Sequence, residues 1–186
     1  MPRTLRFKIE DLSRWHPWFF LEPQAVACVA VLSRYGVSPA RLQVECLNVE
    51  SVWLRSAGEF QLIVAWSPET EEKAQRLRST VQSRPLVEMA ATALALGIAH
   101  HVLRLGQLDV TRYGDRTDYR SLRIPCMLEV SGTETSGELG RRHRQKIAQA
   151  TLNPLGWDAY VVVCAFSSLG HRIRLSFHRV QEPADE

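Results

Sequence analysis

Three carboxylates stand at positions where a charged side chain calls for an explanation. Glu88 is the only charged residue in the apolar stretch from 85 to 99, Asp118 begins a predicted strand, and Glu129 ends the next one, in LEVSGT. If these strands are neighbours in a meander, Asp118 and Glu129 converge at one end of a sheet. Hard divalent cations take oxygen ligands from one or two carboxylates and keep water for a reacting phosphate. The pattern predicts a site for Mg²⁺ or Mn²⁺, held by Glu88, Asp118 and Glu129, that supports phosphodiester cleavage.

Each acid also has a plainer interpretation. Glu129 can be a polar residue at the end of a strand, and Asp115 fits a turn. Glu88 can form a buried ion pair or hydrogen bond, for instance with an arginine of the basic helix further along the chain. An acid inside an otherwise apolar helix is rarely left without a partner, so a partner for Glu88 is expected in either case.

The elements that must position these acids follow from periodicity and turn signals. We predict an N-terminal α/β extension over residues 1–83, with strands at 5–9, 41–49 and 59–66 and helices starting at Pro23 and Pro68. The remainder forms a second unit, 84–180, followed by a tail, 181–186. This unit has a buried helix at 85–103, strands at 107–113, 117–124 and 126–132, a basic helix at 137–152, and strands at 158–166 and 171–180. Thr135 and Glu138 have the spacing of a capping box for the basic helix.

This order of elements, together with GDRTDY and LEVSGT, resembles the PD-(D/E)xK nuclease superfamily. The resemblance covers a little over half of the chain and implies an α/β protein with a restriction-endonuclease-like core. It also implies that Asp118 is the metal-binding Asp, that Glu129 is the second acid, and that Glu88 is the acid carried by the first core helix.

One departure from the family pattern concerns catalysis. The family has a Lys two residues after the second acid, where this chain has Ser131. A hydroxyl cannot supply the positive charge that stabilises phosphoryl transfer, so we expect little or no cleavage by the isolated chain. Some members use a basic residue from the following helix, and Lys146 is the best substitute here if it projects towards the sheet.

Two groups of basic residues border the predicted site. Arg141, Arg142, Arg144 and Lys146 lie within six consecutive positions of one helix, so several of them must face solvent or a partner. Arg172 and Arg174 share the outward face of the last strand by alternation. These arginines are candidates for contacts with nucleic-acid phosphates, and a solvated face is an equally simple interpretation of the helix.

Composition sets the broad class. The chain has 186 residues, 45% hydrophobic and 23% charged, with a net charge of +3, which is typical of a globular protein and permits a DNA or RNA partner without requiring one. The four cysteines are scattered through apolar stretches and are predicted to be buried free thiols. We find no signal peptide and no apolar run of about 18 residues, so a cytoplasmic protein with no membrane partner is expected.

Two functions remain open from the sequence. The chain is either a nucleic-acid-binding nuclease, as a weak metal-dependent endonuclease or a component of a DNA-processing or defence complex, or an inactive pseudoenzyme that serves as a scaffold or protein-interaction subunit. It carries no recognisable DNA-recognition module, which favours a protein partner in a larger complex.

Overall fold

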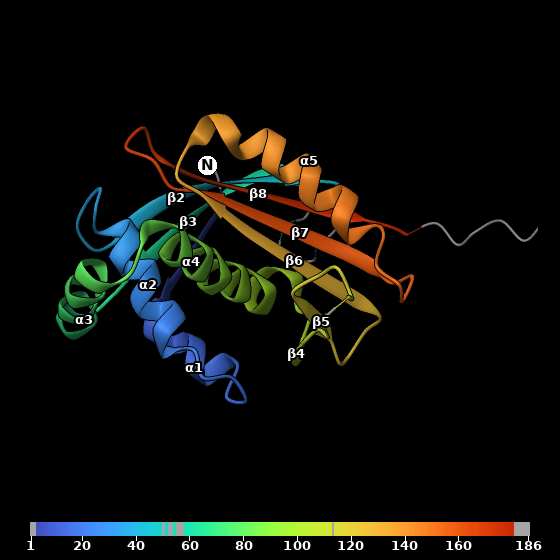
Figure 1. Cartoon of the computed structure of the whole chain (residues 1–186), viewed down its shortest axis with the longest axis horizontal. Helices are drawn as coiled ribbons and strands as arrows, with labels where there is room; N and C mark the ends of the chain where they lie inside the picture. Colours follow the sequence, from blue (N-terminus) through green and yellow to red (C-terminus); the bar gives the residue numbers. More distant parts are fainter. Residues whose placement is uncertain (1–2, 50, 52–53, 55–57, 113, 181–186) are drawn as a thin grey trace, which may run out of the picture.

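One mixed sheet of eight strands runs through the protein, in the order β1-β3-β2-β8-β7-β6-β5-β4 (Figure 1). The computed structural model describes residues 3–49, 51, 54, 58–112 and 114–180. The strands are β1 Arg3–Lys8, β2 Ala40–Leu47, β3 Glu59–Ala65, β4 Leu108–Val110, β5 Tyr119–Ser121, β6 Cys126–Thr133, β7 Asp158–Ala165 and β8 His171–His178.

The directions of the strands divide the sheet into recognisable units. β4, β5 and β6 form an antiparallel meander, β6 pairs with β7 in parallel, and β7 pairs with β8 in antiparallel fashion. β8 then pairs in parallel with β2, which continues through β3 to β1. The sheet and core therefore run across the domain boundary predicted near residue 83.

The helices cover both faces of the sheet (Figure 1). One face carries α2 (Glu22–Leu32) and α4 (Ser83–Ile98), which continues into a π-helical turn at Ala99–Leu103; the other face carries α5 (Leu139–Ala150). α3 (Pro68–Thr80) packs outside α2, and the short helix α1 (Leu12–Trp15) lies between β1 and α2 in the chain. Further 3-10 turns span Ile9–Asp11 and Ser136–Glu138.

The main core lies between the sheet and α2 and α4, and a smaller core lies under α5. α4 is buried nearly all round because its side chains contact both β6 and α2. All four cysteines are buried and free, as predicted. The segment Ser83–Leu103 is long and apolar enough to cross a bilayer by length and composition, contrary to our expectation that no segment would be, but most of it is buried inside the protein.

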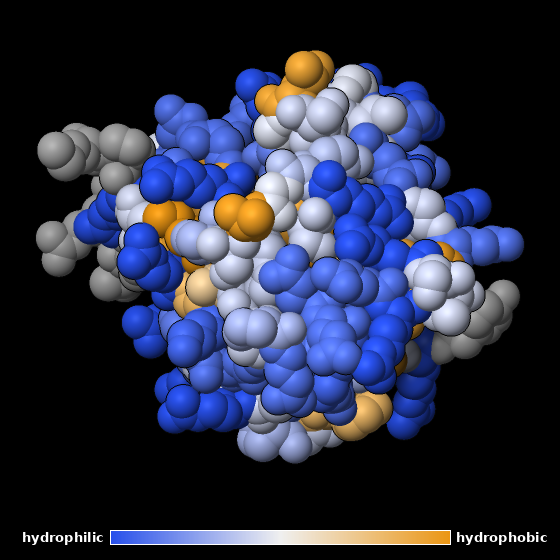
Figure 2. Space-filling view, turned by 90° about the vertical axis from the view of Figure 1, so that its left-hand side faces the viewer, coloured by the Kyte–Doolittle hydropathy of each residue, from blue (hydrophilic) through white to orange (hydrophobic). Residues whose placement is uncertain are grey.

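The outer surface around α3 is hydrophilic. α3 buries only Thr70 and Ala74, and its remaining positions are mainly charged. Figure 2, which views the molecule from the side on which α3 lies in Figure 1, shows a mainly hydrophilic surface with scattered apolar residues on the part that is coloured. This face of the protein is a solvated layer over α2.

Three local predictions require correction. The strand predicted at 117–124 is reduced to Tyr119–Ser121, so Asp118 lies one residue before it. The strand predicted at 107–113 is reduced to Leu108–Val110. The capping box is absent: Thr135 makes no side-chain cap, and the carboxylate of Glu138 accepts a hydrogen bond from Thr133 Oγ1 at 2.9 Å. The predicted tail 181–186 lies outside the described residues.

Candidate active site

The candidate site lies along an open stretch of the edge of β6. β5 pairs only with Met127 and Leu128, so within the described residues no strand lies beside β6 from Glu129 onwards on that side. Two carboxylates occupy this edge instead. Asp118 Oδ2 accepts a hydrogen bond from the Val130 N–H at 2.7 Å, and Glu88 Oε2 accepts one from the Gly132 N–H at 2.8 Å. The acids thereby satisfy buried backbone donors that a neighbouring strand would otherwise satisfy.

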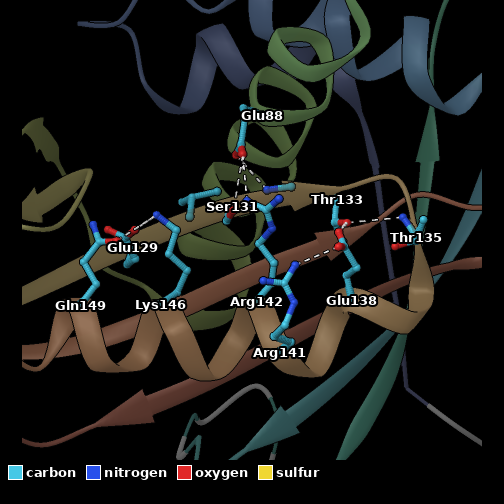
Figure 3. A network of polar contacts seen from close by, with 12 residues as sticks. Glu88, Glu129, Ser131, Thr133, Thr135, Glu138, Arg141, Arg142, Lys146 and Gln149 are labelled. Atoms are coloured by element: carbon cyan, nitrogen blue, oxygen red, sulfur yellow. Dashed lines mark hydrogen bonds and ion pairs between the residues drawn. The ribbon is translucent and has the colours of Figure 1, made fainter.

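Glu129 lies on the opposite face of β6 from Glu88's helix and points towards α5 (Figure 3). Its side chain is fully buried, and Oε1 lies 2.5 Å from the ammonium of Lys146. Its second oxygen, Oε2, is buried and has no hydrogen-bond donor among the described residues. Burial and the nearby Asp118 carboxylate raise the pKa of Glu129 to about 8, although Lys146 opposes the shift. In the metal-free protein at neutral pH, Glu129 therefore carries a proton most of the time.

Asp118 lies next to Glu129, and its pKa is also raised. The residue remains open to solvent, yet the protein atoms around its carboxyl raise its pKa, and the charge of Glu88 adds to the effect. The Val130 N–H and Lys146 act in the opposite direction. Asp118 and Glu129 thus behave as a coupled pair of acids.

α5 presents one polar face to the acids. Arg142, Lys146 and Gln149 follow the i, i+4, i+7 spacing that places side chains on one side of a helix. Lys146 projects from α5 towards the sheet and also donates to Gln149 Oε1 at 3.2 Å (Figure 3). Lys146 therefore reaches from α5 to the buried acid of β6.

Glu88 has partners of the kind anticipated by the plainer interpretation. Oε1 lies 3.9 Å from the guanidinium of Arg142, and the Ser131 hydroxyl donates to the same oxygen at 3.5 Å. Ser131 is buried and turned towards Glu88 (Figure 3). Arg142 is thus part of the charge network of the site and not of the free basic surface.

The acids differ in whether their oxygens are free to bind a metal ion. Within the described residues, no group of three His, Cys, Asp or Glu side chains is arranged to hold a metal ion, so Glu88 does not complete a triad with the other two. Asp118 and Glu129 remain as a pair, and the buried Glu129 Oε2 lacks a donor, as a ligand atom would. Two carboxylates suit Mg²⁺, which usually takes one or two of them together with water and substrate phosphates.

The other basic residues divide into paired and unpaired groups. Arg141 forms an ion pair with Glu138 at 2.8 Å, and Arg174 forms one with Glu45 at 2.7 Å. Arg144 and Arg172 are exposed and have no ion pair in the described part of the chain. The face of β8 predicted to point outward is partly covered by α5, where His143 Nε2 lies 2.8 Å from Ser176 Oγ.

Two site residues were missed by the sequence reasoning. Gln149 accepts a hydrogen bond from Lys146, and Glu45, which lies in β2, accepts one from Arg174 of β8. The spacing of Gln149, three residues after Lys146 on a helix, was a usable signal. No sequence signal pointed to Glu45, because it lies 129 residues away in the sequence from Arg174.

Comparisons with known proteins give no relative from which a function could be transferred: no protein-family model, curated protein or solved structure matches the chain significantly.

Proposed function

We propose that this protein is a metal-dependent phosphodiesterase with a PD-(D/E)xK-type core that acts on DNA or RNA. The contact between Lys146 and Glu129 carries the proposal, because it places an ammonium beside the second acid although Ser131 occupies the usual Lys position. This contact favours an active enzyme, whereas Ser131 considered alone favours an inactive protein.

The order of the elements supports the same assignment. α4, the meander β4-β5-β6, the crossover helix α5 and the parallel strand β7 follow one another in the chain, an order that supports a restriction-endonuclease-like core. Asp118 lies one residue before the second meander strand and Glu129 lies in the third, close to the positions that the resemblance gives to the two acids. Fold alone does not imply activity, so the proposal depends on the side chains.

The residues of the chain have distinct tasks in the proposed reaction. Asp118 and Glu129 would hold Mg²⁺ or Mn²⁺, and the bound ion supplies Lewis-acid stabilisation of the phosphate and a water of lowered pKa. Glu129 would have to be ionised to hold the ion, because a coordinating carboxylate is deprotonated. Lys146 stays at the edge of the site, where its charge stabilises the negative charge that develops on the phosphate. Arg142 is the second cation on the same face of α5.

A second function is favoured by a specific observation. Glu88 is bound to Gly132, Ser131 and Arg142, and within the described residues no third acid joins Asp118 and Glu129. Such a site also fits a nucleic-acid-binding scaffold that has lost turnover and works as a subunit of a DNA-processing or defence complex. Metal binding without cleavage is the result that would select this alternative.

The deciding experiment measures cleavage of labelled single- and double-stranded DNA and RNA with Mg²⁺ or Mn²⁺. We expect slow cleavage by the wild type and loss of it in Asp118→Asn and Lys146→Met. Lys73→Met is the matched control, because Lys73 is also ion-paired but lies on the solvated helix α3. No cleavage by the wild type, or full activity of Lys146→Met, would reject the proposal.

A rescue variant and a binding measurement sharpen the test. Ser131→Lys combined with Lys146→Met returns the ammonium to the position used by the family, and partial recovery of cleavage is expected if only the charge matters. Calorimetric titration of Mn²⁺ into the wild type and Glu129→Ala separates the two functions. Binding that needs Glu129 without any cleavage identifies the scaffold.

A further inference from the structure

Gln149 connects the two sides of the candidate site. Its Oε1 accepts a hydrogen bond from Lys146 Nζ at 3.2 Å, and its Nε2 donates to the backbone carbonyl of Arg116 at 3.1 Å. Arg116 has a left-handed backbone with φ of 60° and lies two residues before Asp118. One side chain therefore joins the helix that carries Lys146 to the loop that carries Asp118.

The chemistry of the two partners determines how the amide is oriented. A lysine ammonium can only donate, and a backbone carbonyl can only accept. Only the orientation with the amide oxygen on Lys146 and the amide nitrogen on Arg116 satisfies both partners. A glutamate at this position could serve Lys146 but could not donate to the carbonyl, and a leucine could do neither.

We propose that Gln149 is a positioning residue that holds Lys146 at the acid pair, an inference that rests on the proposed function. A lysine side chain has four rotatable bonds and loses considerable freedom when its end is fixed. Glu129 supplies one anchor and Gln149 the other. When Glu129 is engaged by a cation, Gln149 is the anchor that keeps the ammonium from swinging into solvent.

The lysine content of the chain makes this directly measurable. The sequence has only three lysines, Lys8, Lys73 and Lys146, and the first two are exposed. Brief labelling with acetic anhydride, followed by peptide mass spectrometry, gives the reaction rate of Lys146 relative to Lys8 in the same sample. We expect Gln149→Leu to raise this relative rate several-fold. Gln149→Glu, which keeps an acceptor for the ammonium, should leave it near the wild-type value.

A matched control lies on the same helix. Gln145 is exposed on α5, so Gln145→Leu should change neither the relative labelling of Lys146 nor cleavage. In Gln149→Leu we expect kcat to fall on the order of tenfold or more with KM unchanged, because a misplaced catalytic group affects the transition state more than binding.

The outcomes separate this inference from the proposed function. Unchanged labelling of Lys146 in Gln149→Leu overturns the inference, as does faster labelling together with a wild-type kcat. If the wild type cleaves nothing, the proposed function fails, and the relative labelling rate still decides whether Gln149 holds Lys146. A Lys73 rate, relative to Lys8, that is the same in every variant shows that any change in labelling is confined to Lys146.

Discussion

The ammonium of Lys146 lies 2.5 Å from Oε1 of Glu129, and this buried contact joins α5 to the middle of β6. Glu129 is fully buried, and its other oxygen has no donor among the described residues. The pair thus leaves the acid only half satisfied. An incompletely satisfied buried carboxylate costs stability unless it is protonated or gains a further cation.

We predict that this acid makes the metal-free protein less stable as the pH rises towards 8. The folded-state pKa of Glu129, about 8, lies above its ordinary value of 4.5, so the folded protein holds the proton more tightly than the unfolded chain does. The stabilisation from this group is complete below pH 4.5 and is lost as the pH rises through 8, by up to about 5 kcal/mol.

Urea unfolding in the presence of a chelator measures this effect. The difference in unfolding free energy between Glu129→Gln and the wild type should increase from about pH 5 to about pH 8 in favour of the variant. Glu69→Gln, a change at an exposed acid of α3, is the control and should keep the wild-type pH dependence. A pH-independent difference for Glu129→Gln would show that Glu129 ionises normally.

Much of the chain between α4 and β8 could be predicted from its sequence. The apolar run of α4, the unbroken apolar stretch of β7 and the alternation in β8 follow the periods that burial imposes on helices and strands. The single sheet could not be predicted in this way. It depends on the parallel pairing of β2 with β8, and no local pattern encodes a contact between such distant strands.

The site was predictable in its residue types but not in its connections. The three acids stood out as charges in apolar or turn segments, and Lys146 stood out as a basic residue of the helix that follows them. The sequence could not show that Glu88 binds the Gly132 N–H, because this contact depends on how closely α4 approaches β6. Nor could it show that β5 is short enough to leave the edge of β6 open to both acids.

The close approach of α4 to β6 leads to a prediction about Gly132. A Cβ at this position would lie 2.5 Å from the backbone oxygen of Val87 and 2.6 Å from its Cγ1, so the backbone of α4 would have to move. We expect Gly132→Ala to destabilise the fold by about 2 kcal/mol, as overpacking of a core usually does, and to displace Glu88. Gly137→Ala is the control because nothing lies within 4 Å of a Cβ there. Equal melting temperatures for the two variants would contradict the prediction.

The final prediction concerns which arginines bind nucleic acid. Arg144 and Arg172 are exposed and have no ion pair within the described residues, whereas Arg141 and Arg174 are paired with Glu138 and Glu45. A phosphate must displace a carboxylate from the paired residues, so the unpaired ones should contribute more to binding. Removing one arginine that binds a phosphate lowers the slope of log affinity against log salt by about one unit.

A salt titration of DNA and RNA binding compares two double variants on this basis. Arg144→Ala with Arg172→Ala should lower the slope by about two units, if both residues bind phosphates, and weaken binding most at low salt. Arg141→Ala with Arg174→Ala removes the same charge from paired positions and should change the slope less. If both double variants keep the wild-type affinity and slope, this surface is only a solvated face. Nucleic acid would then have to approach through the acid pair and Arg142, at the open edge of β6.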